Sequence, residues 1–176
     1  SIFELSVNSY YQMEGIANEW VFASRSSYER DLKAIQSLVR EKTDSNYRTE
    51  ILQPQTGNDS MKYGYNGISQ FSSVRNTDAS STLDKLGFKS EGTNLNLRYQ
   101  NNSILMDSLF GVRYNLSQQP VQKFGFKEIA IKNGVSLSEN EYALPIAFLS
   151  AKPYKNTSFT NLTLDNQTRF IHQITD

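Results

Sequence analysis

The stretch Ile104–Leu116, ILMDSLFGVRYNL, predicts a helix and a strand joined with almost no linker. Ile104–Phe110 is a short apolar run, and residues 101–103 before it supply good N-cap candidates. Gly111 stops the helix, and Val112–Leu116 has the β-favouring residues of a strand. A helix that passes directly into a strand is typical of helices packed on a sheet.

A second passage of the same kind lies earlier in the chain. Ser26 and Glu29 have the spacing of a capping box, and the predicted strand Tyr47–Gln53 follows the helix closely. The helix carries an apolar stripe, which we expect to pack against Ile51 or Val112 of the sheet. The stripe consists of Tyr28, Leu32, Ile35 and Val39.

The last third of the chain favours β-structure. Phe124–Lys132 and Val135–Leu137 flank Asn133 and Gly134, which is the signature of a hairpin with a type I′ turn. Together with the two helix-to-strand passages, this predicts an α+β fold: a mixed, mainly antiparallel sheet with three or four helices packed largely on one face. At 176 residues the chain is long enough for a single domain with its own core.

The two ends of the chain allow more than one interpretation. Residues 1–22 are apolar and aromatic, and Ile2–Val7 alternates as a strand would. The rings of this segment either cover the core or face a membrane or an adjacent domain, so we treat it as a membrane-proximal lead. Residues 153–176 are Asn/Thr-rich and are compatible with a last strand or with a linker into a following domain. The apolar start at Ser1 predicts a piece of a longer protein, with several transmembrane helices before it, although no stretch of the chain itself approaches the ~20 apolar residues that span a bilayer.

Composition excludes several classes of function. Eighteen basic and eighteen acidic residues give zero net charge, and no basic cluster with interleaved aromatic residues is present, which argues against a nucleic-acid partner. The chain has no cysteine, and its single histidine, His172, has no second histidine with which to share a metal. Phosphate-binding glycine loops and Gly-x-Ser-x-Gly elbows are also missing. The sequence therefore predicts no metal, no cofactor and no catalytic residue.

The stretch Tyr63–Ser73, YGYNGISQFSS, is the best candidate for a binding site. Gly64 and Gly67 permit positive φ and a close approach of the backbone, in a loop that is expected to open a short helix near Ile68. Aromatic faces beside a few amides and hydroxyls suit the rings and hydroxyls of a sugar. In the alternative interpretation the glycines make a tight connection and the tyrosines only cap the core. The candidate ligand-binding residues are Asn58, Tyr63, Tyr65, Asn66, Ser69 and Gln70.

Five segments, in this order along nearly the whole chain, together resemble the YfhO family of bacterial membrane proteins. They are Val7–Gln12 with Gly15, Tyr47–Glu50, Asn58–Ser73, Leu105–Asn115 and Glu139–Phe148.

The resemblance implies a polytopic membrane protein, similar to GT-C-like glycosyltransferases that use lipid-linked sugars on the outer side of the cytoplasmic membrane. In Gram-positive bacteria such proteins are associated with glycosylating cell-wall polymers such as lipoteichoic acid. This chain would then be an extracytoplasmic domain that works with the transmembrane part of the same protein and positions the lipid-linked donor or the polymer acceptor. The catalytic carboxylate would lie outside it. Two other classes stay open: a stand-alone carbohydrate-binding or adhesion module, and a glycoside hydrolase, which needs two carboxylates ~5–10 Å apart in one cleft.

Overall fold

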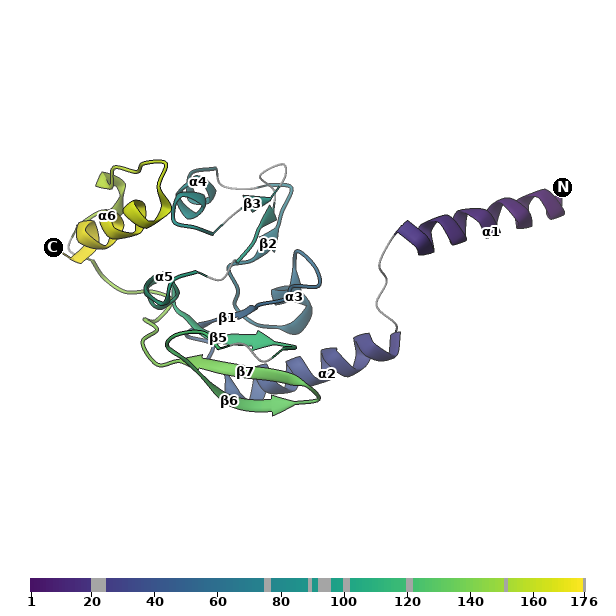
Figure 1. Ribbon diagram of the computed structural model, residues 1–176, viewed down its shortest axis with the longest axis horizontal. Helices are drawn as coiled ribbons and strands as arrows, with labels where there is room; N and C mark the ends of the chain where they lie inside the picture. Colours follow the sequence, from purple (N-terminus) through teal and green to yellow (C-terminus); the bar gives the residue numbers. More distant parts are fainter. Residues whose placement is uncertain are drawn as a thin grey trace.

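A mixed four-stranded sheet lies at the centre of the computed structural model (Figure 1), in the order β1-β5-β7-β6. β1 (Arg48–Ile51) and β5 (Val112–Ser117) run parallel, while β7 (Val135–Asn140) pairs antiparallel with β5 and with β6 (Phe126–Lys132). The α+β class and the mainly antiparallel mixed sheet are thus confirmed. The structure describes residues 1–19, 25–74, 77–88, 90–91, 96–99, 102–119, 122–150 and 152–175.

Both predicted helix-to-strand passages are present. α5 (Ile104–Leu109) begins at Ser103, whose Oγ accepts a hydrogen bond from the Met106 backbone N–H at 3.3 Å. Gly111, with a φ of 68°, turns the chain directly into β5. α2 (Arg25–Lys42) similarly precedes β1. It begins one residue before the predicted N-cap Ser26.

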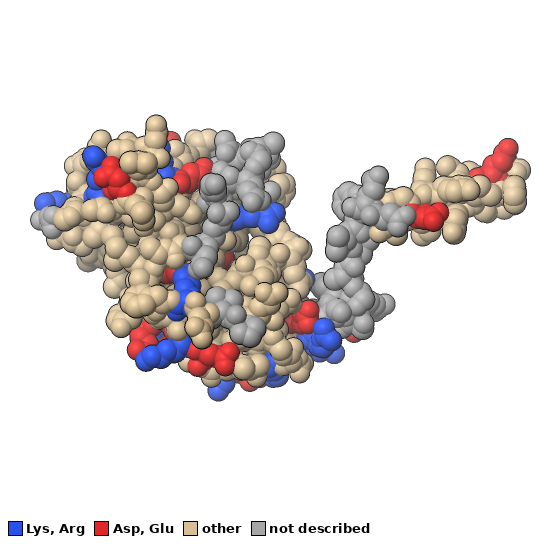
Figure 2. Space-filling view, in the orientation of Figure 1, with Lys and Arg blue, Asp and Glu red and all other residues tan. Residues whose placement is uncertain are grey.

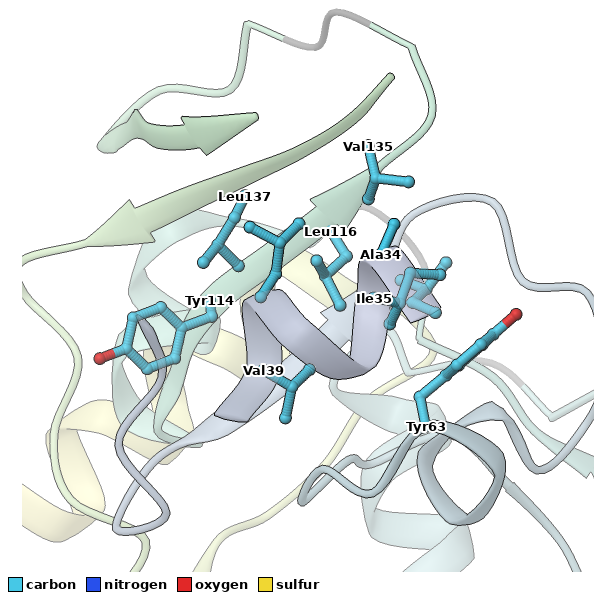
Figure 3. Close-up of a cluster of buried hydrophobic side chains, with 10 residues drawn as sticks. Ala34, Ile35, Val39, Tyr63, Tyr114, Leu116, Val135 and Leu137 are labelled. Carbon is cyan, nitrogen blue, oxygen red and sulfur yellow. The ribbon is translucent and has the colours of Figure 1, made fainter. Parts of the chain in front are cut away.

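α2 covers the apolar face of the four-stranded sheet and builds the first core with it. Ile35 and Val39 of the predicted stripe are buried, Leu32 is half-buried, and the Tyr28 side chain lies outside the described residues. Figure 3 shows Ile35 close to Leu116 of β5 and Tyr63. Ile51 belongs to this core as predicted, whereas Val112 belongs to the second one. The buried members are Ala34, Ile35, Leu38, Val39, Ile51, Tyr63, Tyr114, Leu116, Val135 and Leu137.

The predicted hairpin between β6 and β7 is confirmed. Asn133 has a φ of 50° and Gly134 a φ of 79°, as the two central positions of a type I′ turn require. β6 is an outer strand of the sheet, and its pairing with β7 is interrupted by a bulge between Glu128 and Ala130.

A second core lies around α5 and is closed by short elements and the C-terminal helix. Phe88 and Phe110 pack edge to face with 4.9 Å between the ring centres, and Phe110 stacks on Phe170 at 6.3 Å. Its buried members are Ile68, Leu86, Phe88, Leu97, Tyr99, Met106, Val112 and Phe170. The surrounding elements are α4 (Thr77–Lys85), η1 (Tyr154–Asn156), α6 (Thr163–Thr175), and a small antiparallel sheet of β2 (Gln70–Phe71), β4 (Asn96–Leu97) and β3 (Ser90–Glu91). α3 (Asp59–Tyr63) lies instead against α2 and β1 and contributes Tyr63 to the first core.

The predicted strand at Ile2–Val7 is wrong, because this segment begins the helix α1 (Ile2–Glu19). Its apolar residues fit one side of a helix as well as a strand, since Ile2, Leu5 and Ile16 recur at helical spacing. Every described side chain of α1 is exposed, so its rings do not cover the core. α1 stands apart from the rest of the molecule (Figure 1), and its surface is largely uncharged (Figure 2).

Two further expectations about secondary structure are corrected. The helix near the glycine–tyrosine stretch is α3, which precedes Gly64, and no helix begins at Ile68. Gly64 adopts a φ of 80° and ends α3 with a left-handed cap, so the glycine stops a helix instead of opening one. A last strand in residues 153–176 is also wrong: this segment contains η1 and α6, and Phe170 anchors α6 in the second core.

Candidate functional site

A hollow of about 640 Å³ lies between the C-terminal half of α2 and the loop that follows α3; we call it the α2 hollow. Three of the six candidate residues line it: Tyr63, Tyr65 and Asn66. The other lining residues are Gln36, Val39, Arg40, Thr43, Asp44, Ser45, Tyr47, Thr49 and Gly64.

The loop wall of the hollow is fastened by Asn66. The Asn66 Nδ2 donates to the carbonyl oxygen of Ser45 at 2.8 Å, and the Asn66 carbonyl accepts from the Thr49 backbone N–H at 2.8 Å. The first bond holds the loop to the turn after α2, and the second extends the edge of β1. The loop is therefore positioned by the sheet and by α2 together.

Three phenol rings contribute to the wall of the hollow. Tyr63 is buried in the first core, and its hydroxyl donates to Gln55 Oε1 at 2.8 Å. Tyr65 is half-buried, and burial, with the nearby carboxyls of Glu50 and Asp59, raises its pKa well above the usual range of a phenol. The ring of Tyr47 lies under the guanidinium of Arg113, 4.5 Å from ring centre to Cζ. The three rings are thus held in place by their contacts.

The charges and polar groups of the hollow favour a neutral polyhydroxyl ligand. Arg40 and Asp44 supply one charge of each sign, so the lining attracts neither anions nor cations strongly. The amides of Gln36 and Asn66 and the hydroxyl of Ser45 can donate and accept hydrogen bonds, whereas the Thr43 hydroxyl donates to the Val39 carbonyl at 2.6 Å and can only accept from a ligand. Asp44 is the one carboxylate among the described lining residues, so the hollow lacks the pair that a glycosidase requires.

The other three candidate residues lie away from the hollow. The Asn58 Oδ1 accepts from the Phe71 backbone N–H at 2.9 Å and so connects α3 to β2. Ser69 Oγ donates to Glu50 Oε2 at 2.9 Å and accepts from the Tyr99 backbone N–H at 2.8 Å. Gln70 is exposed on β2. Sequence reasoning missed the α2 side of the hollow, although Gln36, Arg40 and Thr43 recur at helical spacing beside the buried stripe.

Glu50 lies on the face of the sheet opposite α2 and is almost completely buried. It accepts hydrogen bonds from the backbone N–H groups of Ile68 and Ser69, and a Cβ at Gly67 would come within 3.3 Å of its Oε1. Gly67 is therefore required for a close approach and not for a positive φ. Burial raises the pKa of Glu50 to about 7, against the opposing effect of these bonds and of Arg48.

A second buried carboxyl, Asp107, stands in the same part of the protein. It accepts from the Tyr99 hydroxyl at 2.9 Å and forms an ion pair with Lys123, whose ammonium also donates to the Tyr99 hydroxyl. Burial raises the pKa of Asp107 and lowers that of Lys123. Sequence reasoning missed this network, because charged residues scattered along a chain are usually solvated.

Glu50 should make the stability of the protein depend on pH. Its pKa is higher in the folded chain than the ordinary value of 4.5, so the folded chain binds the proton more tightly and its stability falls as pH rises through this window. From pH 5 to pH 8 we expect the free energy of unfolding to fall by about 2–3 kcal/mol more in the native chain than in Glu50→Gln, whose amide stays neutral. Urea denaturation of both proteins at both pH values measures this difference. Equal pH slopes in the two proteins would contradict it.

Comparisons with known proteins identify the family. The family model described as "Bacterial membrane protein YfhO" matches residues 1–176, which confirms the resemblance drawn from the sequence. Searches of curated proteins and of solved structures give no match. Among the helices that the structure describes, none combines the length and the apolar character needed to cross a membrane. The residues that the structure describes also contain no group of three or more His, Asp or Glu side chains that could hold a metal ion.

Proposed function

Because this chain belongs to the YfhO family of bacterial membrane proteins, we propose that it is the extracytoplasmic, acceptor-positioning part of a membrane glycosyltransferase. The transmembrane part of the same protein supplies the catalytic carboxylate and takes sugar from a lipid-linked donor. The acceptor is a cell-wall polymer such as lipoteichoic acid, on the outer face of the cytoplasmic membrane.

The α2 hollow is the observation that carries this proposal. Phenol rings on its wall provide flat surfaces for sugar rings, and its amides and hydroxyls provide hydrogen bonds to sugar hydroxyls. Its balanced charge suits a neutral sugar, and its single carboxylate favours binding over hydrolysis.

The test removes polar lining groups from the full-length protein in its membrane. Gln36→Ala with Arg40→Ala should lower the transfer of sugar to lipoteichoic acid by about tenfold or more, because two exposed polar groups of the lining are lost. The control is Lys33→Ala with Lys127→Ala, which changes two exposed residues outside the hollow and should leave transfer unchanged. Circular dichroism and thermal melting establish that both proteins are folded. Unchanged transfer in a folded Gln36/Arg40 variant would contradict a role of the α2 hollow in acceptor binding.

The stand-alone carbohydrate-binding module makes a different prediction for the same hollow. An acceptor-positioning domain should bind glycan weakly by itself, since the other half of its site belongs to the membrane part. Tight binding of a glycan by the isolated chain, abolished by Asn66→Ala, would favour the module instead.

A further inference from the structure

A second hollow, of about 380 Å³, lies between η1 and α6; we call it the α6 hollow. It shares no lining residue with the α2 hollow. One wall is the face of α6 that carries Thr168, Arg169, His172 and Gln173, and the other is the segment around η1, with Lys152, Asn156, Thr157 and Ser158.

The two walls are held together by contacts beside the hollow. Gln173 Nε2 donates to the carbonyl oxygen of Pro153 at 3.3 Å. The ring of Phe159 stacks on that of Phe170, with 6.5 Å between the ring centres. The segment before α6 is therefore fixed on the helix, and the hollow is part of the fold.

The lining of the α6 hollow is basic. Lys152, Arg169 and His172 contribute an ammonium, a guanidinium and an imidazole, and the described lining residues include no carboxylate. Asp165, one turn before Arg169, pairs with the guanidinium Nε at 2.9 Å and so restrains the side chain. This contact uses one of the five N–H donors of the guanidinium. The planar fork of a restrained arginine suits the oxygens of a phosphate.

A hydroxyl in the wall lacks a partner. Thr157 Oγ1 is shielded from solvent and has no hydrogen-bond partner in the described part of the chain. Buried hydroxyls almost always have one, but this atom lies below the surface of the hollow, so the donors that a ligand meets are those of the exposed neighbours. Ser158 and Asn156 provide further donors beside it.

We propose that the α6 hollow binds a phosphate ester, with Lys152 and Arg169 holding the phosphate oxygens and the exposed Ser158 hydroxyl donating beside them. A volume of about 380 Å³ exceeds that of a bare phosphate and leaves room for a glycerol-sized or sugar-sized substituent. The group could be carried by a soluble polymer or by a lipid headgroup. Its binding does not depend on glycosyl transfer.

The test is titration of the chain with glycerol 3-phosphate, followed by calorimetry or NMR shifts, with glycerol as the uncharged comparison. Lys152→Gln with Arg169→Gln should weaken binding of glycerol 3-phosphate by about tenfold or more, because each loses a charge-assisted contact. Lys127→Gln with Lys132→Gln removes the same charge from β6 and should change binding by less than about twofold. Circular dichroism verifies the fold of both variants.

Vesicles of phosphatidylglycerol, compared with phosphatidylcholine, distinguish the two sources of phosphate. Binding of glycerol 3-phosphate alone assigns the hollow to a polymer phosphate, and binding of both probes assigns it to a lipid headgroup; either result supports the proposal. No binding of either probe, or an equal loss in the β6 variant, would overturn it.

Discussion

Replacing Lys123 by methionine should lower the free energy of unfolding by about 3–5 kcal/mol. Asp107 is completely buried, and the Lys123 side chain is 7% exposed, so the change leaves a carboxylate in the interior without its counter-charge. Methionine keeps apolar contact with the rings of Tyr99 and Phe126, which lie 5.1 and 4.8 Å from the ammonium. The loss of stability in Lys123→Met therefore measures the effect of the missing charge, because the substitution creates no large cavity. Urea denaturation at pH 7 measures it.

The matched control adds Asp107→Asn to the Lys123→Met chain. Asparagine carries no charge and can still accept from the Tyr99 hydroxyl, so the double variant should recover part of the lost stability. A loss under about 1 kcal/mol in the single variant, with no recovery in the double one, would show that the ion pair contributes little.

Truncating Ile35 to alanine should cost about 2–5 kcal/mol, the range for deleting a large side chain from a core. Ile35 is 2% exposed and lies in the first core with Ile51 and Leu137, where the surrounding sheet cannot collapse fully into the space. Thermal or urea denaturation measures the loss. Lys33→Ala, on the exposed side of the same helix, should change stability by less than about 0.5 kcal/mol. A similarly small effect at Ile35 would contradict the packing of α2 on the sheet.

The parts of the fold that the sequence predicted are those decided by local chemistry. The stripe of α2 follows from helical spacing, α5 from its Ser103 cap, and the β6–β7 turn from two residues that tolerate positive φ, Asn133 and Gly134. Each signal lies within a few residues of the element that it specifies. The tertiary packing is compatible with these locally specified elements.

The missed elements depend on contacts that a local pattern does not contain. β2 and β3 are two residues long and exist because each pairs with β4. α1 has no core to fix its period, so the alternation at Ile2–Val7 was misleading. α6 is anchored through Phe170, whose ring stacks on that of Phe110, far away along the chain.

Only one wall of the candidate site was predicted, because the other wall depends on a contact between distant parts of the chain. The loop Tyr63–Asn66 carries its own signal in glycines and rings, but its partner wall comes from α2, which looked like a purely structural helix. The buried state of Glu50 and Asp107 could not be inferred, since the sheet face that covers them forms only when β1 pairs with β5.

The bulge in β6 and the bond between Asn66 and Thr49 have a common consequence for self-association. A sheet edge with free backbone groups invites strand addition by another molecule, which is the first step toward aggregation. At one edge, β6 breaks its regular ladder between Glu128 and Ala130 and carries Lys127 and Lys132, which pair with Glu141 and Glu41. At the other edge, the Asn66 carbonyl occupies the N–H of Thr49 on β1. The four-stranded sheet is thereby protected at both margins against growth into an intermolecular sheet.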